Sequence, residues 1–356
     1  MLNNINCAAI TFEAAVYENT ESLVLMLCKE CAAGVAKINL PESLEAAVNA
    51  FLAKYPDCYE VETVNTLALM HEGKLLQLTI VGCGEGKDCT PANFRKAAGA
   101  VARALQKQKV TTAIVAVPLL LKATRAHYLQ SITEGLYLGA YKFTECKGES
   151  KPDTECSIQI TSAIENAAEV LAQAEAITQG VTLTRNLVNR PGNWVNPVVM
   201  AEEAQKVAEA YNLEIEVLDE KEMAAKGMNA ILAVGQGSKN PPRMITLKYN
   251  GAGDAPYTAF VGKGITFDSG GISIKPGDNM GEMKDDMAGA GAELGAVKAI
   301  AQMKLPCNII AILSCAENMP GGNAQRPGDV VKAANGKTIE VVNTDAEGRM
   351  VLADAV

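Results

Sequence analysis

Short apolar runs alternate with helical patterns through the first part of the chain. LLQLTIVG (75–82) and TTAIVAVP (111–118) each predict a buried strand, because both are short and almost continuously apolar. Helices are predicted over residues 90–109 and from Arg125 to about Tyr141. Thr90 is the expected N-cap of the first, since Thr accepts hydrogen bonds from helix-start amides. This alternation is typical of a mostly parallel sheet covered by helices.

A polar interval at residues 146–157 interrupts the pattern and indicates a boundary. The next segment, 162–189, has helical periodicity without strand signals, so we interpret it as a bridging helix. A second series of strands is predicted at residues 213–219, 243–251, 257–268, 308–315 and 338–345, with a small-residue helix at 287–304. The predicted fold class is α/β with two α/β domains: a smaller N-terminal domain at 1–160, a linker helix at 161–190 and a C-terminal domain at 191–356.

Composition and charge exclude several classes of protein. The 356 residues are 48% hydrophobic but only 4% aromatic, which predicts a well-buried core of small aliphatic side chains. The net charge of −9 opposes nonspecific binding to nucleic acid or to anionic membranes. The N-terminus lacks the features of a signal peptide, and no apolar run reaches membrane-spanning length. We therefore expect a cytoplasmic protein with no membrane partner.

The ten cysteines do not indicate the disulfide framework of a small secreted domain. Cys28 and Cys31 form a C-x-x-C pair, but the chain has no second such pair and only two histidines. We interpret these cysteines as reduced thiols in a core strand and turn rather than as a zinc or redox site.

Charged residues gather at predicted loop ends of the second domain. Asp268 and Asp345 end two predicted strands, and ligands collect at the carboxyl ends of strands in α/β sheets. Asp286 directly precedes the small-residue helix. The neighbouring charged residues are Glu347, Lys263, Lys275 and Arg349.

Each of these residues also has a purely structural interpretation. Asp286 could cap its helix, and Glu347 could complement the dipole of a helix that begins near Gly348. The three basic residues could be ordinary surface charges. The glycine-rich loops and the mutual repulsion of clustered carboxylates favour a bound divalent cation instead. Both histidines, His71 and His127, lie in the first domain, which excludes a histidine-based zinc site.

Other catalytic motifs are incomplete. VGCGEGKD (81–88) is similar to a phosphate-binding loop, but Asp88 stands where Ser or Thr should ligate magnesium. The chain contains no G-x-S-x-G nucleophile elbow.

Several long motifs together resemble the leucyl aminopeptidase family, the M17 peptidases. NTDAEGRM (343–350) is similar to the family's signature octapeptide, with Met350 where Leu is usual. VGKGITFDSGGISIKPGDNMGEMKDDMAGA (261–290) is similar to its other metal-binding segment. Shorter similarities occur at residues 186–197, 227–238, 241–251 and 317–331. The resemblance implies that the C-terminal domain is a mixed-sheet metallo-exopeptidase domain and that the N-terminal one serves oligomerisation or regulation.

The resemblance also implies a site for two divalent metals, Mn²⁺ or Zn²⁺, with Mg²⁺ and Co²⁺ as alternatives. One metal would be held by Lys263, Asp268, Asp286 and Glu347, and the other by Asp268, Asp345 and Glu347. A metal-bridging water or hydroxide would attack the N-terminal peptide bond.

Further roles follow from the same resemblance. Lys275 would stabilise the oxyanion, and Arg349 would anchor a bicarbonate ion as general base. Met283 and Asn343 would contact the substrate, a peptide with a free N-terminus. The full-length protein would be a homohexamer.

The chain departs from the family at its end. It stops at Val356, six residues after the octapeptide, whereas the family's catalytic domain continues well beyond this point. We therefore expect the sequence to be C-terminally incomplete. The alternatives are an inactive truncated or DNA-binding regulatory member of the same family, or another dinuclear hydrolase such as an amidase or a phosphatase.

Overall fold

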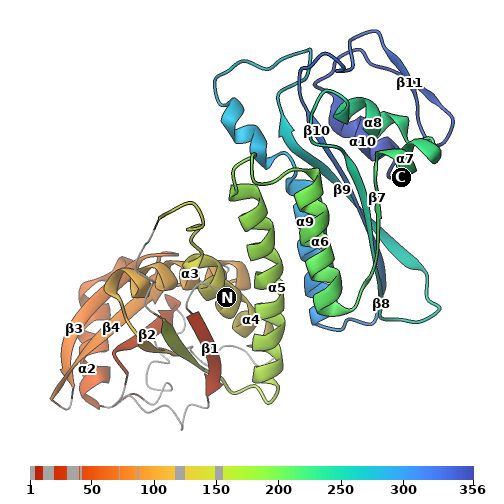
Figure 1. Cartoon of the computed structure of the whole chain (residues 1–356). Helices are drawn as coiled ribbons and strands as arrows, with labels where there is room; N and C mark the ends of the chain where they lie inside the picture. The colour runs from red at the N-terminus through yellow and green to blue at the C-terminus, as the bar shows by residue number, and fades with distance from the viewer. Residues whose placement is uncertain are drawn as a thin grey trace. The chain divides into compact units, whose positions relative to one another are not determined.

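The computed structural model describes residues 5–10, 20–29, 40, 42–71, 73–85, 88–116, 125–148 and 155–356. The chain divides into two compact units, Met1–Thr178 and Gln179–Val356 (Figure 1). The division falls inside α5 (Ala167–Asn189), the helix predicted over 162–189. No helix in these residues is both long and apolar enough to span a membrane.

The first unit is built on a six-stranded sheet in the order β1-β6-β5-β2-β4-β3. All neighbouring pairs are parallel except the β3–β4 hairpin at one edge. The strands are β1 (Ile5–Ile10), β2 (Ser22–Leu27), β3 (Val64–His71), β4 (Lys74–Gly82), β5 (Thr112–Ala116) and β6 (Cys156–Thr161). The predicted strands at 75–82 and 111–118 are confirmed as β4 and β5, although residues 117–118 lie outside the described part.

Helices cover both faces of this sheet. They are α2 (Glu42–Lys54), α3 (Pro91–Gln108) and α4 (Arg125–Ala140), with a short 3₁₀ helix η3 (Pro56–Tyr59). The Thr90 side chain accepts a hydrogen bond from the Asn93 amide at 3.3 Å, which confirms the predicted cap. Every residue of β2 is buried, because alternate side chains pack toward α2 and toward α3. A continuous apolar run is what a strand covered on both faces requires.

Cys28 directly follows β2 and is buried. It is disulfide-bonded, so the expectation of a reduced thiol at this position is wrong. That expectation depended on compartment and composition, which do not determine whether two sulfurs lie within bonding distance. Cys31 lies outside the described residues, as do Gly86 and Lys87 of the phosphate-loop-like segment.

The second unit contains a four-stranded mixed sheet in the order β7-β8-β10-β9. β8 runs antiparallel to both of its neighbours, whereas β10 and β9 are parallel. The strands are β7 (Glu214–Leu218), β8 (Arg243–Asn250), β9 (Tyr257–Asp268) and β10 (Asn308–Asn318). This arrangement confirms the predicted mixed sheet and four of the five strands predicted for the domain.

Two groups of helices enclose this sheet (Figure 1). One face packs against α6 (Pro197–Tyr211), α9 (Ala288–Gln302) and the end of α5, and the other against α7 (Glu220–Ala225), α8 (Asn229–Gly235) and α10 (Glu347–Ala353). On β8 the side chains of Ile245 and Leu247 belong to the first core and that of Met244 to the second. The sheet therefore places the carboxyl ends of β9 and β10 side by side, near the start of α10.

The predicted strand at 338–345 is wrong over most of its length. Only Thr338–Glu340 form a strand, β12, which pairs with β11 (Val330–Lys332) in a separate two-stranded sheet. Beyond β12, the Thr344 amide donates to the Ser273 hydroxyl and the Asp345 amide donates to Asn343 Oδ1, so neither donates to a neighbouring strand. Local side-chain hydrogen bonds of this kind compete with sheet formation. Asp345 is therefore a loop residue, not the end of a strand.

Candidate metal centre

The site begins at the carboxyl end of β9, where the pairing with β10 changes register. Ile265 lies opposite Ala316, but Asp268 lies opposite Asn318, so β9 contains one extra residue between these pairs. Such a bulge bends a strand and redirects the following side chain. It places the buried carboxylate of Asp268 next to the buried amide of Asn318.

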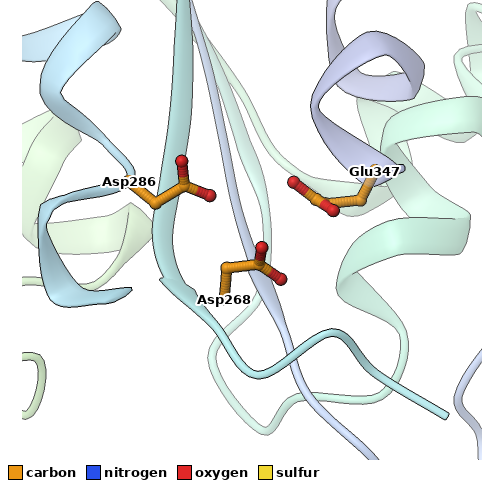
Figure 2. Close-up of side chains that lie close together, drawn as sticks. All are labelled: Asp268, Asp286 and Glu347. Atoms are coloured by element: carbon orange, nitrogen blue, oxygen red, sulfur yellow. The ribbon is translucent and has the colours of Figure 1, made fainter. Parts of the chain in front are cut away.

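Three carboxylates converge from three separate elements (Figure 2). Asp268 comes from the end of β9, Asp286 from the turn after the 3₁₀ helix η6 (Met280–Asp285), and Glu347 from the first turn of α10. One carboxylate oxygen of each lies within 4.8 Å of those of the other two. Carboxylates so close together repel one another unless positive charge lies between them.

Two lysines supply positive charge to these acids. Lys263 Nζ lies 2.8 Å from Asp286 Oδ2 and 3.0 Å from Glu347 Oε1. Burial opposes the charged form of Lys263, but its hydrogen bonds to these two acids prevail and raise its pKa. Lys263 is therefore not an ordinary surface charge.

Lys275 lies between the other two acids of the cluster. Its Nζ is 2.9 Å from Asp268 Oδ2 and also forms an ion pair with Asp345 Oδ1. The bonds and charges of Asp345 and Asp268 raise the pKa of Lys275 despite its partial burial. Asp345 thus joins the cluster through Lys275.

Asp286 does not cap α9, which was the structural interpretation that the sequence allowed. The N-cap of α9 is Met287, and no side chain caps that helix. Burial raises the pKa of Asp286 to about 6, and Lys263 opposes that shift only in part. A partly buried acid held against two other acids is arranged for a ligand rather than for capping.

Glu347 provides a test of whether these residues fit a metal ion. Its side chain is only 1% exposed, and its Oε2 atom has no hydrogen-bond partner among the described residues. A buried carboxylate oxygen without a partner is costly, and a cation would satisfy it. The remaining donors are carboxylate oxygens and one lysine amine, a set that suits Mg²⁺, Mn²⁺ or Zn²⁺. The residues therefore fit a divalent metal.

A buried threonine joins the two loops that carry the acids. Thr344 Oγ1 donates to the Gly270 carbonyl at 2.6 Å and accepts from the Ser273 amide at 2.8 Å. Gly270 and Gly271 have φ angles of +86° and +67°, a region that favours glycine. Sequence reasoning missed the roles of Asn318, Thr344 and Ser273; their only signal was their place beside or within the quoted motifs.

The remaining predicted residues lie outside this cluster of contacts. Arg349 is exposed on α10 and forms no ion pair with the described residues. Asn343 is also exposed, and its Oδ1 accepts from the Asp345 amide at 2.8 Å. Met283 is half-buried in η6. The structure therefore brings together Lys263, Lys275 and the four acids. The side chains of the other three predicted residues are exposed or half-buried.

Comparison with known proteins identifies the family to which this chain belongs. A model of the cytosol aminopeptidase family's catalytic domain matches residues 182–356, and a model of its N-terminal domain matches residues 60–150. The chain belongs to the cytosol aminopeptidase family. The predicted resemblance to the leucyl aminopeptidase family, the M17 peptidases, is thereby confirmed.

Relatives in two bacteria are similar over most of this chain. A protein of Roseiflexus castenholzii named "Probable cytosol aminopeptidase" is 41% identical over 95% of this chain and 68% of its own length. A protein of Geotalea uraniireducens with the same name is 42% identical over 83% of this chain and 61% of its own. The chain thus spans about two thirds of the length of these relatives.

One similar solved structure contains a metal. It is named "Bottromycin maturation enzyme BotP in complex with Mn" and superposes with a TM-score of 0.79 at 32% identity. The match covers 94% of this chain and 68% of that one.

Proposed function

We propose that this chain acts as a metal-dependent aminopeptidase that releases residues from peptides with a free N-terminus. The observation that carries the proposal is the convergence of Asp268, Asp286 and Glu347 within 4.8 Å in a chain of the cytosol aminopeptidase family. Lys263, Asp268, Asp286 and Glu347 would hold one divalent ion, and Asp268, Asp345 and Glu347 the second. Such ions, when bound, lower the pKa of water and polarise the carbonyl of the peptide bond.

The metals in this proposal are Mn²⁺ or Zn²⁺, with Mg²⁺ and Co²⁺ as alternatives. The carboxylate donors support all four, and Lys263 must lose its proton before its amine can act as a ligand. Its present partners, Asp286 and Glu347, are themselves proposed ligands, so a metal would replace the ammonium charge between them.

Lys275 is assigned to the developing oxyanion. Its ammonium lies beside Asp268 and Asp345 and carries a raised pKa, so it stays charged at neutral pH. A fixed ammonium next to the reacting carbonyl stabilises negative charge that develops on its oxygen.

Arg349 is assigned to binding bicarbonate as a general base. Its exposed guanidinium is not used by an ion pair with the described residues, which leaves it available to an anion. Met283 and Asn343 are assigned to the substrate, since each has side-chain surface that is exposed or half-buried.

The setting of the enzyme is also part of the proposal. We assign it to the cytoplasm as a homohexamer, with no membrane or nucleic-acid partner. Residues 1–160 would serve oligomerisation or regulation, residues 161–190 the link, and residues 191–356 the catalysis. The acidic net charge of −9 supports the exclusion of nucleic acid.

Hydrolysis of leucyl anilide by the purified chain tests the proposal. We expect hydrolysis that stops on chelation, returns with Mn²⁺ or Zn²⁺, and fails on N-acetyl-leucyl anilide, whose amine is blocked. Glu347→Gln should abolish it and weaken Mn²⁺ binding, whereas Glu340→Gln, at an exposed acid on β12, should leave both unchanged. Activity that survives chelation would contradict the metal. Absence of activity in a chain that binds DNA in a salt-dependent gel shift would favour the regulatory alternative.

A further inference from the structure

Asn318 connects both halves of the metal centre through one side chain. It ends β10, is 1% exposed, and lies between the end of β9 and the loop that carries Asp345. Its Nδ2 donates to Asp268 Oδ1 at 2.8 Å and to the Thr344 carbonyl at 3.0 Å. Both N–H groups of the amide are therefore used, one on a proposed ligand and one on the residue preceding another.

We infer that Asn318 is a positioning residue that sets the orientation of the Asp268 carboxylate and thereby the metal affinity of the site. The inference rests on the proposed function, because it concerns the same metal centre. The inference goes beyond the proposed function because Asn318 is not one of the proposed metal ligands.

The hydrogen bonds of Asp268 show how this orientation is set. Oδ1 accepts from Asn318 Nδ2 and from the Gly270 amide at 3.0 Å, whereas Oδ2 faces Lys275 Nζ at 2.9 Å. Rotation of the carboxylate would break both bonds to Oδ1. Asp268 therefore keeps Oδ2 on the side of Lys275, and partners of this kind orient metal ligands.

The amide of Asn318 can face the site in only one way. In the reversed orientation its oxygen would lie against Asp268 Oδ1 and the Thr344 carbonyl, which are both acceptors. The amide oxygen instead packs beside Gly271, where a Cβ would come within 2.8 Å of it. The longer side chain of Gln would have to displace this loop.

The neighbouring hydroxyl groups are already occupied. Ser269 Oγ donates to the Asn318 carbonyl at 2.8 Å, and Thr344 Oγ1 donates to the Gly270 carbonyl at 2.6 Å. Neither can replace the Asn318 amide without losing its own bond. Loss of this amide therefore leaves Asp268 Oδ1 with the Gly270 amide alone.

Asn308 provides a matched control on the same strand. It begins β10, is 2% exposed, and its Nδ2 also donates twice, to the carbonyls of Gly253 and Ala255 at 2.8 Å and 2.7 Å. Removal of either amide costs buried hydrogen bonds, so both changes should lower stability. Only Asn318 contacts a proposed metal ligand.

The experiment measures Mn²⁺ binding to the 356-residue chain through the electron paramagnetic resonance signal of free Mn²⁺. Asn318→Leu should raise the dissociation constant by about 10- to 100-fold, the usual effect of losing a partner that orients a ligand. Asn308→Leu should change it less than about threefold while it lowers the melting temperature. Asn318→Ser and Asn308→Ser form a second pair of variants, in which the smaller polar side chain leaves room for water. This pair decides the result if a leucine variant does not fold.

The possible outcomes separate this inference from the proposed function. A wild-type chain that binds no Mn²⁺ contradicts the metal centre itself. If the wild-type chain binds Mn²⁺, equal dissociation constants for the Asn318 variants and the wild type overturn the inference. Equal losses in the Asn318 and Asn308 variants overturn it as well, because they reveal a general loss of stability.

Discussion

Gly348 lies directly against the side chain of Lys263. A Cβ at position 348 would lie 2.8 Å from Lys263 Cδ and 2.9 Å from its Cε and Nζ. Gly348 occupies the first turn of α10, next to Glu347, so the helix approaches the lysine without a side chain between them. The glycine of the octapeptide thus leaves room for the lysine of the other motif, 85 residues earlier in the chain.

Gly348→Ala should impair metal binding without unfolding the protein. The added methyl group meets the flexible end of a side chain, so Lys263 can move away, but its Nζ then leaves Asp286 and Glu347. We expect metal affinity to fall by about 10-fold or more. Alanine also gains helix propensity of about 1 kcal/mol, which limits any loss of stability.

Calorimetric titration with Mn²⁺ checks this prediction, with urea unfolding beside it. Gly322→Ala is the control, because a Cβ there has no atom within 4 Å. Unchanged affinity in Gly348→Ala would show that Lys263 takes no part in binding.

Thr344→Val should loosen the connection between the two metal-binding loops. Valine has nearly the same shape but lacks the hydroxyl that bonds to Gly270 and Ser273. The Gly270 carbonyl that loses its donor is buried and Ser273 is half-buried, so the free energy of unfolding should fall by about 1–3 kcal/mol. Thr344→Ser retains the hydroxyl and should lose less.

Urea denaturation of the wild type, Thr344→Val and Thr344→Ser measures the difference in the free energy of unfolding. Thr266→Val serves for comparison. Thr266 is buried on β9, and its hydroxyl makes a long contact of 3.4 Å with the Ala316 carbonyl. Equal losses at both positions would mean that the hydroxyl of Thr344 has no special structural role.

Gly295→Ala should destabilise the second unit even though it adds a better helix former. A Cβ at 295 would lie 2.5 Å from the Gly180 carbonyl oxygen and 2.6 Å from Thr184 Oγ1, so α5 and α9 would have to separate. Overpacking of this kind costs about 1–3 kcal/mol. At Gly291, on the same helix, the nearest atom would be Met287 Cε at 3.4 Å.

Gly291→Ala should therefore be neutral or slightly stabilising. Thermal unfolding of both variants provides the comparison. A Gly295→Ala variant as stable as the wild type would rule out the close helix contact.

Cys315 should make stability fall at alkaline pH. It is fully buried on β10, and burial raises its pKa from 9.0 to about 12. Between these values the folded chain keeps the thiol proton that the unfolded chain has lost. The stabilising contribution is therefore complete below pH 9 and is lost as pH rises toward 12, at up to about 1.4 kcal/mol per pH unit.

Comparison with Cys315→Ala isolates this contribution, because all other titrating groups remain. Urea unfolding at several pH values above 9 should show a steeper decline for the wild type. Parallel curves for the two proteins would contradict a buried, protonated thiol.

Local patterns in the chain predict most of the elements and the chemical type of the site. The Thr90 cap, the helix that follows it and all twelve residues of β9 could be read from short stretches, because capping and apolar periodicity depend on neighbours in sequence. The motifs around Asp268 and Glu347 also indicated the family. The same local reasoning predicted a strand at 338–345 that is wrong over most of its length, because the amides of Thr344 and Asp345 donate to side chains.

The partnerships inside the site depend on contacts between distant parts of the chain. Composition and spacing could not show that Lys263 lies between Asp286 and Glu347, nor that Lys275 joins Asp268 to Asp345. Asn318 acquires its place only through the bulge in β9 and the parallel pairing with β10. Residue types and their order along the chain specify which ligands are present, whereas packing of the sheet against α9 and α10 specifies which atoms meet.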